Sequence, residues 1–236
     1  MDHLSGSGGI RSTIPGLEKH FFSIRDHLLP ELQSSVAIKS LMDAVPATVI
    51  SECKVLVDET FLALRKEERV RVLFEHLNSH WSFFDYNLLE HLVKKFGSQQ
   101  LKNSMDGYVS SIQHFFRHTT VQQLSIACPL FQRPSNYSDM EVQISQDCST
   151  YSVEKLNNLR DECCQKLNLT DVLIFFGVLL EADSFRVVWL LSTVHTAHLI
   201  DNMNQIDTHF LHQEGIVRII VEQQLLYQSK EVCHRQ

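Results

Sequence analysis

The sequence predicts an α+β protein in which a helical N-terminal part precedes a part that combines strands and helices. From Leu17 to about Leu124 the apolar residues recur with the period of a helix, and runs of β-branched residues are rare. After Met140 come three runs typical of strands, at 172–176, 187–190 and 216–221. Charge changes at the same place, because residues 1–137 carry 14 basic and 14 acidic side chains and the remainder carry 7 and 14.

These changes in composition set the predicted domain boundaries. Glycine and serine dominate residues 6–9, and Pro129 and Pro134 interrupt the chain after the helical part. We therefore expect a disordered tail at 1–15, a helical bundle at 16–128, a linker at 129–138, a second domain at 139–229 and a tail at 230–236.

The helical bundle is predicted helix by helix from its apolar stripes. The first helix places Leu17, Phe21, Ile24 and Leu28 on one face at spacings of four, three and four residues. Gly97 is a suitable C-terminal cap for the fifth. The expected helices lie at 17–33, 35–44, 46–57, 64–79, 88–96 and 99–117, and a short seventh helix opens at Thr120.

The periodicity of the second domain predicts the order of its strands and helices. We expect a strand at 140–145, a helix at 153–167, strands at 172–181 and 185–191, a helix at 193–213 and a strand at 216–226. The order β-α-β-β-α-β is the ferredoxin-like arrangement, in which right-handed crossovers place both helices on one face of the sheet. The middle strands carry apolar residues on both faces, so we expect the other face to pack on the helical bundle or on a partner.

Composition excludes several classes of protein. A chain of 236 residues with 44% hydrophobic and 21% charged residues is typical of globular proteins and unlike a disordered or disulfide-framework chain. A ferredoxin-like sheet invites comparison with RNA-recognition modules, but the net charge of −7 lies entirely in that half and would repel phosphates. We therefore expect no nucleic-acid partner.

Location follows from the N-terminus and from the apolar runs. The first residues show no basic segment followed by an apolar one, so a secretory signal is not expected. The longest apolar run, Val172 to Leu180, is about half the length of a membrane span. We expect a cytoplasmic protein with reduced cysteines and no membrane partner.

No pattern in the sequence predicts catalytic chemistry. His76 and His80 lie four residues apart, with His91 in the next helix, but Leu77 stands where a zinc protease would have glutamate. The sequence contains no GxSxG motif and no phosphate-binding glycine loop. We expect no enzyme activity, no catalytic residue, no cofactor and no metal.

The helical part resembles a known family of interaction modules. Segments 21–29 (FFSIRDHLL), 36–45 and 65–74 (RKEERVRVLF) resemble the first, second and fourth helices of death-fold modules of the caspase-recruitment type. Segment 81–90 (WSFFDYNLLE) is similar to a region of multidomain invertebrate proteins that also carry death or ankyrin modules. The resemblance covers roughly residues 17–125. It implies an adaptor or scaffold in apoptosis or innate-immune signalling, whose partners are other death-fold modules or itself.

In such modules a basic face of helices 1 and 4 pairs with an acidic face of helices 2 and 3. The matching basic residues here are Arg25, Arg65, Lys66, Arg69 and Arg71, and the matching acidic residues are Asp43, Glu52, Asp58 and Glu59. Two alternatives remain open at this point. Charged helix faces can simply be solvated, since exposed ion pairs contribute little. The ferredoxin-like half could also sense a small ligand.

Overall fold

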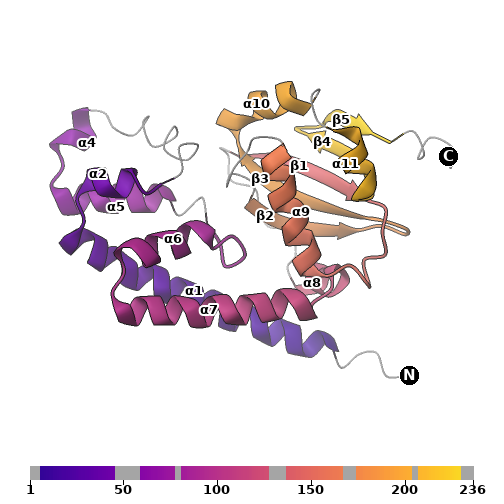
Figure 1. Ribbon diagram of the computed structural model, residues 1–236. Coiled ribbons are helices and arrows are strands. Elements are labelled where there is room, and N and C mark those ends of the chain that lie inside the picture. Colours follow the sequence, from indigo (N-terminus) through magenta and orange to yellow (C-terminus); the bar gives the residue numbers. More distant parts are fainter. Residues whose placement is uncertain are drawn as a thin grey trace. The chain divides into compact units, whose positions relative to one another are not determined.

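A computed structural model describes residues 6–45, 59–77, 81–127, 137–166, 174–203 and 207–229 (Figure 1). Within these ranges an N-terminal helical region precedes a five-stranded antiparallel sheet, so the predicted α+β class is confirmed. The chain divides into two compact units. The helical unit is Ser12–His114, and the sheet unit begins at Phe115 and includes the first residues of the first helix.

The helical unit is built from helices that the apolar period largely predicts. They are α1 (Gly6–Ser35), α2 (Ile38–Met42), α4 (Glu59–Ala63), α5 (Lys66–Leu77), α6 (Asn87–Phe96) and α7 (Gln99–His118), whose last turn reaches into the sheet unit. The helix expected at 46–57 lies outside the described residues. The short α4 was not predicted, because its five residues are too few to show a period.

Helix α1 begins earlier than expected. The predicted disordered tail at 1–15 is wrong from Gly6 onward, because α1 starts there. Ile14 is buried and extends the stripe of Leu17, Phe21 and Ile24 by one turn toward the N-terminus. Glycine and serine at 6–9 hid this continuation, since they carry no apolar signal.

Tyr108 of α7 lies at the centre of the helical core. Its ring is fully buried and lies within 6 Å, between centroids, of the rings of His20, Phe21 and Tyr86. Its hydroxyl donates a hydrogen bond to the carbonyl of Phe83. This single side chain therefore joins α1, α7 and the segment that leads into α6.

The sheet unit follows the predicted order with one added strand. Its strands are β1 (Tyr137–Ile144), β2 (Ile174–Leu180), β3 (Phe185–Ser192), β4 (Ile216–Val221) and β5 (Gln224–Gln228), arranged in the order β2-β3-β1-β4-β5. Its helices are α8 (Val121–Ala127), α9 (Val153–Lys166), α10 (Thr193–Met203) and α11 (Thr208–Gln213). Met140 pairs with Trp189 on one side and Val221 on the other, and all three are buried.

Two expected elements in this unit are each divided. The strand predicted at 216–226 is a hairpin of β4 and β5, because Glu222 and Gln223 take left-handed backbone angles (φ 47° and 68°) that reverse the chain. Neither residue is a usual turn signal. The helix predicted at 193–213 is two helices, and Asp207 caps the second by accepting a hydrogen bond from the His209 N–H at 2.9 Å.

The boundary between the units falls within α7 rather than in the predicted linker. Helix α8 contacts β2 and α9, so it belongs to the sheet unit and not to the bundle expected at 16–128. Two backbone bonds fix its start, from Val121 N–H to the Tyr151 carbonyl at 2.8 Å and from Val153 N–H to the Thr119 carbonyl at 2.9 Å. The last residues of the predicted linker, 137 and 138, are the first of β1, and residues 128–136 are outside the described part.

Candidate protein-interaction surface

The end of α1 organises one surface of the helical unit. The Glu31 carboxylate accepts hydrogen bonds from the Ser98 N–H at 2.6 Å and the Ser98 hydroxyl at 2.8 Å. Ser98 precedes α7, so Glu31 anchors the start of that helix to α1. The Gln33 amide donates to the carbonyl of Glu67 at 3.1 Å, and α2 contacts α5. The starts of α5 and α7 and the short α2 therefore meet at the end of α1.

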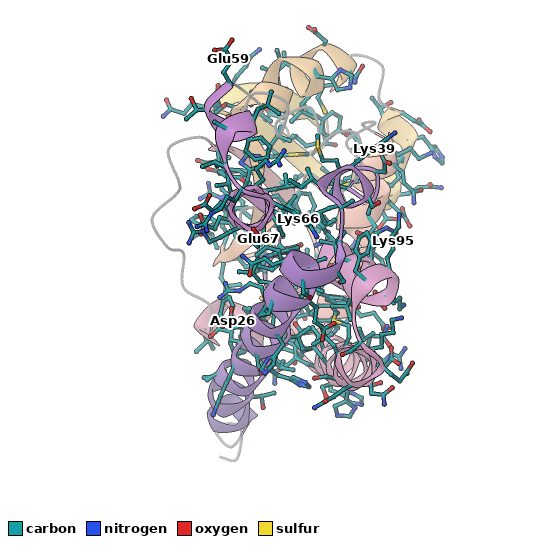
Figure 2. All side chains as sticks on the ribbon, turned by 90° about the vertical axis from the view of Figure 1, so that its left-hand side faces the viewer. Asp26, Lys39, Glu59, Lys66, Glu67 and Lys95 are labelled. Atoms are coloured by element: carbon teal, nitrogen blue, oxygen red, sulfur yellow. The ribbon has the colours of Figure 1, made fainter. Side chains whose placement is uncertain are left out.

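Three lysines from three helices lie on this surface. Lys39 belongs to α2, Lys66 is the first residue of α5 and Lys95 lies in the last turn of α6. Figure 2 shows Lys39 and Lys95 toward one side of the view and Lys66 near its middle, and we call the three residues the lysine side. Within the described ranges none of the three has a carboxylate at ion-pair distance. Their charge is therefore not neutralised by the residues that surround them there.

Three carboxylates lie on the opposite side of the same view. Asp26 of α1, Glu59 of α4 and Glu67 of α5 form what we call the acidic side (Figure 2). All three are exposed. Asp26 is ion-paired with Arg25 at 2.7 Å, whereas Glu59 and Glu67 have no cation at ion-pair distance among the described residues. The surface defined by these six residues is thus bipolar, and the division runs through α5, where Lys66 and Glu67 are adjacent.

The five predicted basic residues are only partly available to a partner. Each of the following pairs is an ion pair between residues close in sequence: Arg25 with Asp26 at 2.7 Å, Arg65 with Glu68 at 3.2 Å and Arg71 with Glu75 at 3.8 Å. Arg69 is half-buried, and its Nε has no hydrogen-bond partner among the described residues. Only Lys66 joins the lysine side. The predicted basic face is therefore interrupted by neighbouring acids.

The Arg65–Glu68 pair is a local capping device. Glu68 accepts from the Arg65 backbone N–H at 3.0 Å as well as from its guanidinium, as in a capping box at the start of α5. These bonds, the side-chain one first, lower the pKa of Glu68, and the bond to Glu68 raises the pKa of Arg65. Arg65 is exposed and Glu68 is partly exposed, so the pair fixes the helix start without contributing much stability.

The predicted acidic residues are divided in the same way. Asp43 is exposed at the C-terminal cap of α2, and Glu59 opens α4 on the acidic side. Glu52 and Asp58 lie outside the described residues. Asp26 and Glu67 were not among the predicted acidic residues, because each directly follows a basic residue in a segment interpreted as basic. Helical spacing was the available signal, because consecutive residues of a helix point in different directions.

A polar groove of about 250 Å³ lies between α1 and α7. It is lined by Ser23, His27, Glu31, Ser98, Gln100 and Ser104, above Ile24 and Leu101. The polar groups largely bond one another, since His27 Nδ1 lies 2.6 Å from the Ser23 carbonyl oxygen and Glu31 binds Ser98. The bonds of Glu31 with Ser98 thus join α1 to the start of α7 along this groove.

The possible zinc ligands do not gather in the described part of the chain. His76 lies in α5 and His91 in α6, whereas His80 is outside the described residues. No group of three or more histidine, cysteine, aspartate or glutamate side chains there is arranged to hold a metal. None of the helices described has both the length and the apolar character needed to cross a membrane.

The chain was compared with protein-family models, with curated proteins and with solved structures, and none of the three comparisons found a match. The function proposed below therefore rests on the surface of the helical unit described above.

Proposed function

We propose that this chain is a non-catalytic cytoplasmic scaffold whose helical unit binds a like helical module, with the lysine side of one meeting the acidic side of the other. The observation that supports it is the bipolar surface of Figure 2, on which Lys39, Lys66 and Lys95 have no carboxylate partner among the described residues. We further propose that the helical unit is a death-fold module and the sheet unit a ferredoxin-like domain. The strand order β2-β3-β1-β4 supports the second assignment.

Charge complementarity suits a recruitment role. A head-to-tail contact places the lysine side of one copy opposite the acidic side of the next, and both surfaces remain available at the ends of the assembly. Exposed charges contribute little affinity individually, but an array of them sets orientation, partner choice and association rate. The contact is therefore reversible and sensitive to salt.

A charge exchange tests this proposal with the full chain. One variant carries Lys39→Glu, Lys66→Glu and Lys95→Glu, and the other carries Asp26→Lys, Glu59→Lys and Glu67→Lys. Sedimentation velocity at about 50 mM NaCl should show that the wild type associates through this contact, and that each variant alone loses it. An equimolar mixture of the two variants should regain a complex, since each then meets the opposite charge.

Lys19→Glu is the matched control, because Lys19 is exposed on α1 but lies several turns from the lysine side. It should leave association unchanged. The proposal is wrong if the mixture behaves as the sum of the separate variants, or if about 0.5 M NaCl does not weaken the wild-type contact.

A further inference from the structure

Each edge strand of the sheet contacts one helix. β2 forms one edge and is in contact with α8. β5 forms the other edge, beyond β4 (Figure 1), and is in contact with α10, but no described strand pairs with its outer side. An edge strand presents unpaired backbone N–H and C=O groups, which can pair with another strand.

β5 lacks the side chains that usually protect such an edge. Its sequence, Gln-Leu-Leu-Tyr-Gln, contains no charged residue and no proline. Leu225 is 48% exposed, although a leucine of a strand is commonly covered, and Leu226 and Tyr227 are half-buried. The strand therefore combines apolar side chains with backbone groups on its outer side that pair with no described strand.

The strand is also complementary to itself. In an antiparallel pair centred on Leu226, Leu226 lies opposite its own copy, Leu225 opposite Tyr227 and Gln224 opposite Gln228. Leucine beside tyrosine is a favourable cross-strand pair, and glutamine side chains can bond each other. We propose that two copies of this chain dimerise by pairing their β5 strands about a two-fold axis.

A bulge in β5 keeps this contact short, and the two-fold arrangement closes it. Pairing with β4 shifts register between Ile219 and Ile220, which face Tyr227 and Leu225, so Leu226 is the extra residue of the bulge. A bulge bends and twists its strand, which keeps the pairing short and opposes continued stacking of sheets. A two-fold pair uses the β5 of both copies, so no further copy can add at that edge.

This dimer does not involve the charged surface of the helical unit, but it would raise the apparent affinity with which that surface binds a multivalent partner. Two helical units in one particle make the second binding event intramolecular, which raises the apparent affinity for any multivalent partner. The β5 contact is backbone and apolar in character, so salt should not weaken it, unlike the charge contact.

Salt separates the two contacts in one experiment. In about 0.5 M NaCl, where charge contacts are screened, the wild type at about 100 µM should sediment as a dimer. Leu225→Lys should give a monomer, because it places a charge on the edge, opposite Tyr227 of the second copy. Leu180→Lys is the matched control at the end of β2, where Leu180 is 42% exposed, and it should remain a dimer.

Hydrogen exchange gives a second measure that does not depend on the variants. Amides of residues 224–228 in the wild type should exchange more slowly as protein concentration rises, whereas those of the β2 edge should not change. A wild type that is monomeric in high salt, or a Leu225→Lys protein that dimerises equally well, overturns the proposal. The lysine-side variant should still dimerise, so the failure of one contact is distinguishable from failure of the other.

Discussion

Replacing Tyr108 with phenylalanine should destabilise the helical unit while leaving its core packing in place. The change removes one oxygen and keeps the ring that contacts His20, Phe21 and Tyr86. What is lost is the hydrogen bond to the carbonyl of Phe83. The effect therefore measures how strongly that single bond holds the segment before α6 against α7.

The expected loss is about 1.5 kcal/mol, since a partly buried carbonyl loses its donor and is only partly compensated by water. With a urea dependence of about 1.5 kcal/mol per molar, the midpoint of unfolding should fall by about 1 M. Burial raises the pKa of the Tyr108 hydroxyl above the ordinary 10.0, so the folded state keeps its proton. The wild type should therefore lose stability as the pH rises above that value, because the unfolded tyrosine ionises, and the variant should lose less.

The chain provides a fluorescent reporter for each unit. Trp81 lies in the helical unit and Trp189 in the sheet unit, and the sequence has no other tryptophan. With Trp189→Phe as background, Tyr108→Phe should lower the urea midpoint reported by Trp81. With Trp81→Phe as background, the same change should leave the Trp189 transition where it was.

Tyr227→Phe is the matched control, because Tyr227 lies in β5 of the other unit. It should not move the Trp81 transition. An unchanged Trp81 midpoint in the Tyr108→Phe protein would show that the Tyr108 hydroxyl contributes no stability that water cannot replace, and would contradict this prediction.

Three further predictions concern single residues. Gln223→Gly should raise the urea midpoint of the Trp189 transition by the equivalent of about 0.5 kcal/mol, because the relief of backbone strain at a φ of 68° exceeds the cost of the added entropy of glycine in the unfolded chain. A lower midpoint would contradict this prediction. NMR titration should show the pKa of the Glu68 carboxyl below its ordinary value, so the contribution of Glu68 to stability is present above its pKa in the unfolded chain and is lost as the pH falls through its pKa in the folded protein. Arg65→Ala should raise the pKa of Glu68 in the folded protein, and an unchanged titration would count against the ion pair. Burial raises the pKa of the Cys163 thiol, so iodoacetamide at about pH 8 should modify half-buried Cys148 in the native protein and Cys163 only in urea. Peptide mass spectrometry measures the modification, and equal labelling of the two cysteines in the native protein would contradict the prediction.

Local patterns predicted most helices and strands because each element carries its own signal. The α5 stripe of Val70, Leu73, Phe74 and Leu77 is buried as its spacing indicates. The errors lie where the local signal is weak or misleading. Glu222 and Gln223 turn the chain without the glycine or asparagine that usually marks a hairpin.

The candidate surface could be predicted only in part. The resemblance to death-fold modules identified the basic stretch of α5 but not the ion pairs along it, although the spacing of three and four residues was visible in the sequence. The lysine side could not be predicted, because Lys39, Lys66 and Lys95 belong to three different helices. The end of α1 is joined to the starts of α7 and α5 by contacts of Glu31 with Ser98 and of Gln33 with Glu67, which are 67 and 34 residues apart.

The α+β class, the order of most elements and the concentration of negative charge in the second half could all be predicted from the amino-acid sequence. These properties depend on the spacing of near neighbours, which a helix or a strand converts directly into a buried face. Tertiary structure alone decided that α8 belongs to the sheet unit, that β5 is an edge and which charges share the end of α1. Those properties depend on contacts between segments far apart in the chain, and no local pattern records which segments meet.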